Sequence, residues 1–304
     1  MFRLLSLVAA AMAFVLAVLG SWVRINGAGM TCPDWPLCHG ALVPDLRGGV
    51  VLEWSHRLVA FVLIVPVALA LAAAWRERRR VAGIVPAIGA IATIFGVQVV
   101  LGAATVRLSN TPWSVALHWG TGMLFLAGLV ALAILAVVRP SPKRVPAVRS
   151  ALYPLLVLGA ASAFAAMCAG AYVSSSGAGL ACTSLPFCTN GTSSALNGLQ
   201  VAQMTHRIFA ALLFVVATFG VYLATTGAPV RVRNTVLVGY GLLLLQIALG
   251  IANVVWRLPV DLREAHAANA AATFVVYVAA WIFAAIDGTI RVPATERTQR
   301  TVYA

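Results

Sequence analysis

The chain has 304 residues, of which 62% are hydrophobic and only 10% are charged, and its mean hydropathy is +0.95. Soluble globular domains carry about a quarter charged residues, so this composition excludes an ordinary soluble protein and indicates an integral membrane protein. The net charge of +13 does not predict nucleic-acid binding, because the basic residues are spread over short loops and form no single basic face.

Eight apolar runs predict transmembrane helices, because about 20 apolar residues in a helix cross the ~30 Å hydrocarbon core of a bilayer. The first run follows a basic residue and could be read as a signal peptide. It corresponds, however, to the internal fifth run, which cannot be a cleaved leader, so we expect it to remain as a span. The runs lie near residues 4–23, 51–75, 82–104, 113–138, 151–171, 201–224, 235–255 and 265–286.

Basic residues are concentrated in alternate loops, and this asymmetry predicts the orientation of the chain. Fourteen arginines and lysines lie in the loops after the second, fourth and sixth spans and at the two ends of the chain, against four in the loops between them. Because cytoplasmic loops carry the excess of basic residues, we expect both termini on the cytoplasmic side.

The sequence repeats itself about 150 residues along. Residues 27–38 match 177–188 and residues 51–63 match 201–213 at an offset of 150, and residues 95–106 match 243–254 at an offset of 148. Four spans return the chain to its starting side, so the two halves run in the same direction and are related by an axis along the membrane normal. We therefore expect an all-α membrane protein of two tandem four-helix bundles with a pseudo-two-fold axis, residues 1–140 and 150–304, joined by a cytoplasmic linker at 141–149.

Four of the five histidines lie inside predicted spans, where histidine is expensive and tends to face the bundle interior. His56 and His118 lie about six residues inside the outer ends of the second and fourth spans, ~8–9 Å below the boundary. His206 and His266 repeat this arrangement in the sixth and eighth spans. Two imidazoles at equal depth on neighbouring helices can ligate one iron from opposite faces of a haem, so we predict two haem sites.

Two other readings of these histidines remain open. Interhelical histidines can act only through hydrogen bonds that stabilise helix packing. Zinc or copper is the third possibility, and it is disfavoured because no carboxylate or thiolate lies at the same depth to complete a compact site.

The two halves differ at one acidic position. Glu53 lies three residues before His56, whereas the second half has Gln203 there. One helical turn gives ~4.5 Å of rise and nearly the same face, so the carboxylate would lie against a macrocycle. A charge in only one half favours a catalytic role, and the alternative is an interfacial glutamate, solvated or paired with Arg57. Glu264 is a weaker candidate, because it lies two residues before a histidine and points to another face.

Arg57 and Arg207 follow the first histidine of each half. Each could extend its guanidinium to the membrane surface or pair with a haem propionate, and the sequence does not separate these roles. His39 stands in an outer loop beside a cysteine, and we expect it to be a solvated loop residue.

Paired cysteines occupy the two longest loops, both on the outer side. Cys32 with Cys38, and Cys182 with Cys188, are C-x5-C pairs, and thiols this close outside the cytoplasm are expected to form disulfides. Each pair is either a structural clamp, whose small loop places its stabilisation at or below the low end of the usual ~2–4 kcal/mol, or, in the first half, a redox-active pair. Cys168 lies alone in the fifth span, where we expect it to pack as a small apolar residue.

Together these features resemble the haem A synthase family, in the bacterial type that carries cysteine pairs. The resemblance rests on an E-x-x-H-R motif at Glu53, His56 and Arg57, a second intramembrane histidine, the repetition of both histidines without the glutamate, and the paired cysteines. It covers the whole chain and implies an enzyme of the bacterial cell membrane that oxidises the C8 methyl group of haem O to a formyl group, giving haem A for terminal oxidases.

The resemblance also implies a division of labour between the halves. Haem b would be a cofactor held by His206 and His266, and the substrate haem O would lie between His56 and His118. Glu53 would place negative charge where a cation develops, or take up protons and position water. The implied partners are the protohaem farnesyltransferase that makes haem O, by analogy, and an electron acceptor that the sequence does not identify.

Two other classes of protein fit parts of the pattern. A di-haem cytochrome b-type carrier that oxidises quinol explains four histidines but neither Glu53 nor the cysteine pairs. A transporter with parallel repeats explains the duplication but not the histidines.

Overall fold

The computed structural model describes residues 1–140, 145–146, 151–188, 196–287 and 289–290. These residues form eight long helices, each long and apolar enough to cross a membrane, which confirms the eight predicted spans. The helices are α1 (Phe2–Ile25), α2 (Gly49–Arg76), α3 (Ile84–Arg107), α4 (Pro112–Val138), α5 (Leu152–Ser175), α6 (Gly198–Gly227), α7 (Val230–Val255) and α8 (Val260–Asp287). A short 3-10 helix, η1 (Ala178–Leu180), follows α5, and two-residue strands β1 (Val145–Pro146) and β2 (Thr289–Ile290) pair antiparallel.

Local sequence explains where several helices begin. Pro112 stands in the first turn of α4, where its missing N–H removes no helical hydrogen bond. Asn197 and Gln200 form a capping box at the start of α6, each side chain bonding the other's backbone N–H at 3.0 Å. Gly83 precedes α3 with a φ of 80°, a left-handed conformation that glycine adopts without strain.

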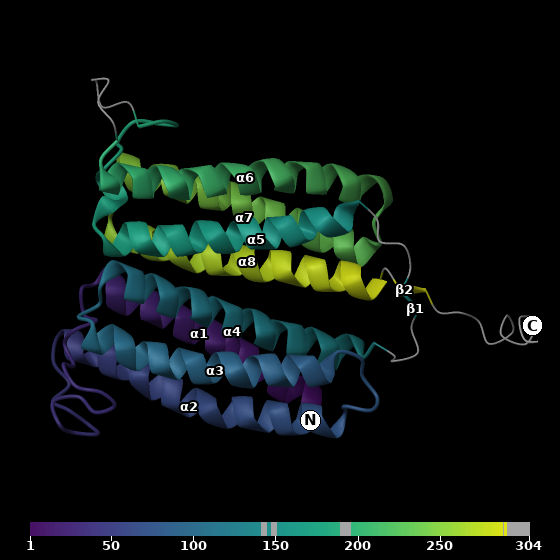
Figure 1. Ribbon diagram of the computed structural model, residues 1–304, viewed down its shortest axis with the longest axis horizontal. Helices are drawn as coiled ribbons and strands as arrows, with labels where there is room; N and C mark the ends of the chain where they lie inside the picture. Colours follow the sequence, from purple (N-terminus) through teal and green to yellow (C-terminus); the bar gives the residue numbers. More distant parts are fainter. Residues whose placement is uncertain (141–144, 147–150, 189–195, 288, 291–304) are drawn as a thin grey trace, which may run out of the picture.

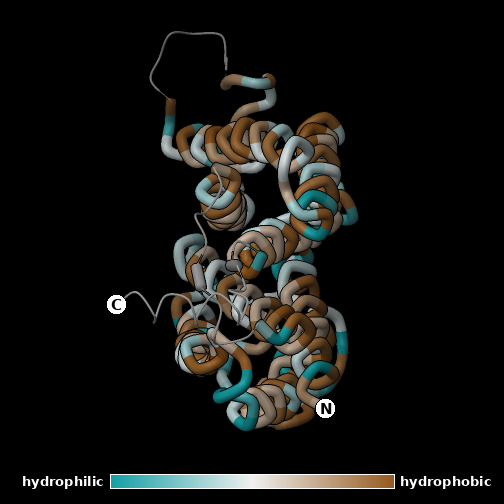
Figure 2. Tube along the Cα trace, turned by 90° about the vertical axis from the view of Figure 1, so that its right-hand side faces the viewer, coloured by the Kyte–Doolittle hydropathy of each residue, from teal (hydrophilic) through white to brown (hydrophobic). Residues whose placement is uncertain are grey.

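The helices form two groups of four, with α1–α4 beside α5–α8 (Figure 1). The all-α class and the tandem arrangement are therefore as expected, while the two-fold axis between the groups stays a prediction. Helices α1 and α4 of the first group contact α5 and α8 of the second. The tube coloured by hydropathy shows hydrophobic residues along the helices of both groups (Figure 2). Of the expected linker at 141–149, only residues 145–146 lie within the described part of the chain.

Small residues bring the two groups close together. A Cβ atom added at Gly120 of α4 would lie 2.9 Å from the Cys168 sulfur and 3.5 Å from the Phe164 ring, both on α5. Cys168 belongs to neither disulfide, and it packs at this contact, as expected for a small apolar residue. Close approach of backbones at small residues is how helices associate in a membrane, where water exclusion provides no driving force.

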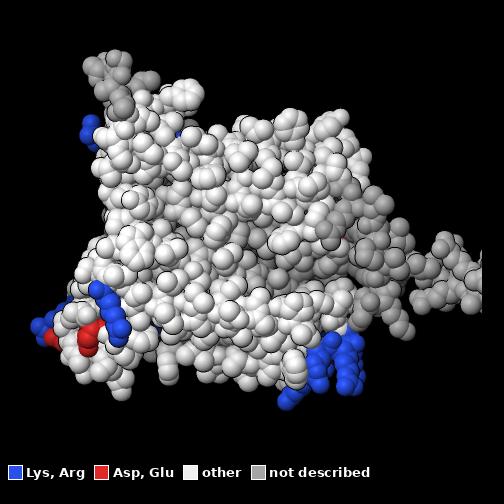
Figure 3. All heavy atoms as spheres, viewed as in Figure 1, with Lys and Arg blue, Asp and Glu red and all other residues white. Residues whose placement is uncertain are grey.

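The surface fits a lipid environment. In the face shown, charged side chains gather near the two ends of the helices and the wide band between them carries none (Figure 3). Large apolar side chains are exposed within this band's helices, for example Phe61 at 72% and Phe219 at 61%. The chain is therefore a multi-pass membrane protein.

Candidate haem sites and disulfide loops

The four intramembrane histidines lie at similar depth near one end of the molecule. They occupy α2, α4, α6 and α8, and each lies six to eight residues after the first residue of its helix. The ring centroids of His206 and His266 are 6.3 Å apart. His56 of α2 and His118 of α4 occupy the corresponding places in the first half. The structure thus brings the two histidines of the second half together, and ligation of a haem by either pair stays a prediction.

The second pair fits a flat, axially ligated metal group. A metal–imidazole bond of about 2.0 Å plus the radius of each ring places two opposed ring centroids about 6 Å apart, close to the observed separation. His206 donates its Nδ1–H to the Ala166 carbonyl over 2.8 Å, which leaves Nε2 free as a metal ligand in the usual arrangement. Among the described residues, no group of three or more His, Cys, Asp and Glu side chains converges on a common point.

The first pair fits such a group on a different observation. The Nδ1 atoms of His56 and His118 are buried and have no hydrogen-bond partner within the described part of the chain. Buried polar atoms are otherwise nearly always paired, and of these two imidazoles only that of His56 has a backbone neighbour to bond, Leu16, which stands 150 residues before the Ala166 that bonds His206. A haem between the rings would account for the burial of both imidazoles.

Each histidine also packs against a glycine of the preceding helix, a feature that the sequence reading missed. A Cβ atom added at the glycine would lie between 2.8 and 3.3 Å from the imidazole Cε1, closer than most real contacts. The pairs are Gly20 with His56, Gly102 with His118, Gly170 with His206 and Gly250 with His266. The imidazoles therefore lie directly against a neighbouring backbone, and any larger residue would push them away.

Two glutamines were likewise missed. Gln98 of α3 has its amide nitrogen 3.5 Å from Nε2 of His118. Gln246 of α7 has its amide nitrogen 3.1 Å from Nε2 and 3.2 Å from Nδ1 of His266. A signal was present, because both are isolated polar residues at matched positions, 148 apart, within apolar runs.

Both predicted disulfides form in the loops that follow α1 and α5. Cys32 and Cys38 have Cα atoms 4.7 Å apart, and Cys182 and Cys188 have Cα atoms 4.9 Å apart. These separations lie within the range that a disulfide spans. The redox-active alternative for the first pair is not tested by this geometry.

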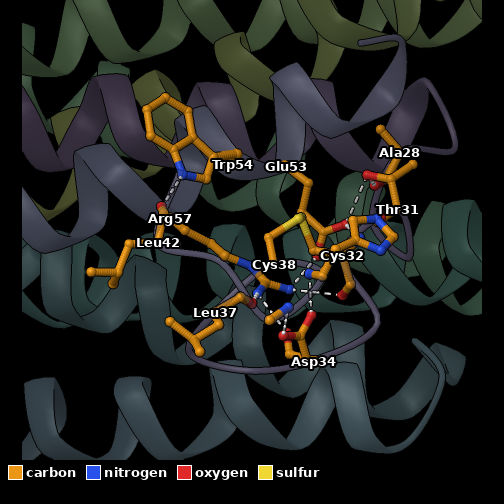
Figure 4. The surroundings of a disulfide bond; sticks show 12 residues. Ala28, Thr31, Cys32, Asp34, Leu37, Cys38, Leu42, Glu53, Trp54 and Arg57 are labelled. Atoms are coloured by element: carbon orange, nitrogen blue, oxygen red, sulfur yellow. Dashed lines mark hydrogen bonds and ion pairs between the residues drawn. A yellow bond between two sulfur atoms is a disulfide. The ribbon is translucent and has the colours of Figure 1, made fainter. Parts of the chain in front are cut away.

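Glu53 is buried beneath the first disulfide loop, with 4% of its surface exposed. One carboxylate oxygen accepts hydrogen bonds from the Cys32 backbone N–H at 2.8 Å and the Thr31 hydroxyl at 3.0 Å, and the other accepts from Arg57 at 2.6 Å (Figure 4). The ion pair with Arg57, which was expected if Glu53 is only an interfacial residue, is therefore present. This geometry does not test a catalytic role for Glu53.

Gln203 takes the equivalent place in the second half. Its side-chain oxygen accepts from the Cys182 backbone N–H at 2.5 Å, and its amide nitrogen donates to the Gly179 carbonyl at 2.9 Å. The residue at this position therefore supports the first cysteine of the loop in both halves. What differs between the halves is the negative charge.

The two arginines anchor the disulfide loops, a role that the sequence reading did not consider. Arg57 donates to Glu53 and to three loop carbonyls, those of Cys32, Asp34 and Leu37. Arg207 donates to the carbonyls of Cys182, Ser184 and Pro186. These bonds occupy both terminal nitrogens of Arg57, so a haem propionate that binds Arg57 would have to share its N–H groups with the loop carbonyls or displace those carbonyls. The propionate contact stays a prediction.

His39 is an exposed loop residue, as expected, and its Nε2 lies 2.9 Å from the Thr31 carbonyl. The neighbouring Asp34 carboxylate accepts the backbone N–H groups of Gly40 at 2.8 Å and His39 at 2.6 Å. These donors, Gly40 above all, hold the pKa of Asp34 below its usual value. The first disulfide loop is therefore closed by a small network of its own.

Glu264 lies at the contact between the two halves and is 8% exposed. It accepts a hydrogen bond from the Ser21 hydroxyl of α1 at 2.5 Å, while Arg24 of α1 bonds the Ser174 hydroxyl of α5. The second carboxylate oxygen of Glu264 has no partner among the described residues. These contacts give Glu264 an interhelical position that its spacing from His266 did not indicate.

Known proteins resemble the chain over most of its length. Residues 3–47 and 46–278 match the model of a family described as "Cytochrome oxidase assembly protein", COX15-CtaA. The chain is 28% identical over 280 residues to a protein of Bacillus pumilus named "Heme A synthase", covering 87% of this chain and 89% of that protein. It is 31% identical over 272 residues to a protein of the same name from Bacillus licheniformis, covering 84% and 87%.

Proposed function

Because the chain belongs to this family of cytochrome oxidase assembly proteins, we propose that it is a membrane-bound haem A synthase, which oxidises the C8 methyl group of haem O to a formyl group. The names of its relatives support this activity. The observation that carries it is the repeated arrangement of two histidines and a disulfide loop, in which the buried side chain under the loop is a carboxylate, Glu53, in the first half and an amide, Gln203, in the second. Electron transfer alone would not require a charge in one half and an amide in the other.

The two halves take different haems in this proposal. His206 and His266 hold haem b as the resident cofactor in residues 150–304, and His56 and His118 hold the substrate haem O in residues 1–140. Haem b, when bound, would supply a one-electron redox centre. The ring separation and the Nδ1 bond of His206 support the assignment of the cofactor to the second half.

Glu53 is the catalytic residue of the proposal. Its carboxylate is held by the Cys32 N–H, the Thr31 hydroxyl and the Arg57 guanidinium, so its charge is already in position before the substrate reacts. A fixed negative charge stabilises positive charge that develops on the substrate. The positive charge of Arg57 partly offsets the negative charge of Glu53, and the same ion pair fixes the position of the carboxylate.

The disulfide loops complete each site at one end. Arg57 and Arg207 draw three carbonyls of their loop toward the start of α2 and α6. With both termini in the cytoplasm, these loops lie on the outer side of a bacterial cell membrane, where disulfides persist. The protohaem farnesyltransferase that makes haem O is the expected supplier of substrate, and the electron acceptor is a further partner.

Extraction of the pigments from the purified protein tests the proposal. Haem O or haem A recovered beside haem b supports a haem A synthase. Haem b alone would instead identify a di-haem carrier that oxidises quinol, and the absence of haem would leave a transporter with parallel repeats. Expression in a host that makes haem O ensures that the substrate is available.

A further inference from the structure

Three side chains join α6 to α7 in the second half, on the inner side of the histidines, which is the side away from the disulfide loops. The rings of Phe214 on α6 and Tyr240 on α7 face each other, with centroids 6.2 Å apart and planes inclined by 23°. The Thr218 hydroxyl donates to the Phe214 carbonyl at 2.8 Å and bonds the Tyr240 hydroxyl at 3.2 Å. Phe214 follows His206 by eight residues, about 12 Å along the helix. The aromatic pair therefore closes the α6–α7 seam, the line along which these helices meet, just beyond the level of the histidines.

The corresponding seam of the first half, between α2 and α3, has no such bridge at these positions. The counterparts, at offsets of 150 and 148 residues, are Ile64 and Ala68 in α2 and Ala92 in α3. None of these side chains carries a ring or a hydroxyl, and α2 and α3 contact each other less than α6 and α7 do. Contact between the halves runs mainly through α1, α4, α5 and α8, and α2 and α3 lie on the far side of the first group (Figure 1). The α2–α3 seam therefore borders the lipid.

The two seams matter because the halves hold different haems in the proposed function, on which this inference rests. Haem O differs from haem b by a farnesyl-bearing tail, which takes the place of a vinyl group on the edge of the macrocycle opposite the two propionates. The charged propionates stay near the membrane surface, because a charge is costly in hydrocarbon. The histidines lie near the disulfide-loop end of their helices, so the propionates face the loops and the tail points inward.

The interior of the first bundle leaves no space for such a tail beneath the histidines. Buried side chains fill it there, none of them more than 3% exposed: Leu63 and Val67 of α2, and Leu126 and Leu129 of α4. Because protein interiors are close-packed, a farnesyl chain cannot be added among these residues. The tail must therefore pass between two helices into the lipid. Among neighbouring helices of the first half, α2 and α3 have the least extensive contact, so their seam is the way out.

We propose that these two seams determine which haem each half accepts. Phe214 and Tyr240 fill the α6–α7 seam and so exclude the tail of haem O, which leaves the second half selective for tail-less haem b. Ile64 and Ala92 leave the α2–α3 seam free for the tail of haem O and of haem A. Filling the space that a competing ligand needs is an effective way to reject it. The alternative is that the aromatic pair only packs α6 against α7.

The second half is tested in a chain that carries His56→Ala, because removal of this ligand makes the bound haem report on the second half. The full-length protein is purified from a host that makes both haem b and haem O, and the extracted pigments are separated by chromatography. His56→Ala alone should hold haem b. Adding Phe214→Ile and Tyr240→Ala, which copy the first half, should raise the ratio of haem O to haem b about tenfold or more, the effect of relieving an overfilled apolar site.

A matched control changes two aromatic residues of the same kinds elsewhere on α6. Phe219 and Tyr222 are 61% and 65% exposed, and neither takes part in the Phe214–Tyr240 contact. Phe219→Ile with Tyr222→Ala, in the same His56→Ala chain, should leave the pigment ratio unchanged. A rise in haem O that is equal in the control and in the seam variant would overturn the proposal.

The converse change tests the first half in a chain with all four histidines. Ile64→Phe with Ala92→Tyr copies the second half and should lower bound haem O and haem A about tenfold or more, while haem b is retained. Val65→Phe is the control, because Val65 is 60% exposed and lies beside the seam residue Ile64 in the sequence; it should bind haem O at the wild-type level. Retention of haem b distinguishes a blocked seam from a misfolded protein.

The outcomes separate this proposal from the proposed function. Wild-type pigment ratios in both seam variants would show that the aromatic pair only packs the helices, even if the wild-type protein makes haem A. A wild-type protein that holds haem b alone would refute the proposed function. The Phe214→Ile and Tyr240→Ala chain would then still decide the role of the seam, because uptake of haem O by its second half supports exclusion by the aromatic pair and its continued absence contradicts it.

Discussion

Changing Glu53 to glutamine separates the structural work of this side chain from its charge. Gln203 shows that an amide at this position still accepts the N–H of the first cysteine, at 2.5 Å. The variant loses the ion pair with Arg57. In this pair the N–O distance is 2.6 Å, and the side chains of Glu53 and Arg57 are 6% and 15% exposed. Arg57 keeps its three loop carbonyls, so the stability lost should not exceed ~1.5–3 kcal/mol, the usual contribution of a hydrogen bond to a charged group.

The effect on turnover should be larger than the effect on folding. A charge aimed at a developing cation in a dry site contributes several kcal/mol to the transition state. We expect haem A formation to fall about a hundredfold or more, which corresponds to ~2.7 kcal/mol. Product is measured by chromatography of extracted pigments, with total haem content and thermal stability measured on the same samples.

The reverse change, Gln203→Glu, is the matched control. It places a carboxylate beside Arg207 and should not create a second reactive site, because the second half holds haem b. If Glu53→Gln made haem A at the wild-type rate with normal haem content, Glu53 would only anchor the loop and the catalytic assignment would be wrong.

Three further outcomes follow from the same contacts. Cys32→Ala should impair turnover more than Cys182→Ala if the first disulfide serves the reactive half, and equal losses of activity and folded protein would indicate two structural clamps. Gly170→Ala should shift or weaken the haem b spectrum, because its Cβ would lie 3.0 Å from the His206 ring. Gly241→Ala is the control and should leave the spectrum unchanged, because no atom lies within 4 Å of its added Cβ. An unchanged spectrum in both variants would show that Gly170 does not hold the His206 ring in place. The pKa of Asp34 is lower in the folded protein than in the unfolded chain. Its stabilisation of the loop is therefore complete above about pH 3.9, the unfolded value, and is lost as the pH falls through the lower folded pKa. Reduction of the first disulfide by a phosphine should accelerate below the folded pKa in the wild type but not in Asp34→Asn.

The spans, the histidine pairs and the disulfides could be predicted from the sequence because each depends on local spacing. A bilayer requires about 20 apolar residues in a row, and the internal repeat placed His56 and His206 in the same register. The C-x5-C spacing brings two thiols together whatever the rest of the loop does. In these places the sequence pattern is sufficient, because one chain segment determines the result.

The contacts that the sequence reading missed all join segments that are separated along the chain. Gly170 contacts His206 from another helix, and Asn269 reaches Gln246 across the α7–α8 contact. Arg57 reads as a membrane-edge arginine in the sequence, yet it binds a loop 20 to 25 residues earlier in the chain. Such contacts depend on side-chain reach and on which helix faces which, and neither follows from the periodicity of a single segment.

His206→Ala is the most direct test of whether the second half holds haem b and the first half holds the substrate. The purified variant is analysed by electron paramagnetic resonance for low-spin haem b and by pigment extraction for haem O. We expect the low-spin haem b signal to be lost while haem O remains bound between His56 and His118. A variant that keeps the haem b signal at the wild-type level would contradict it.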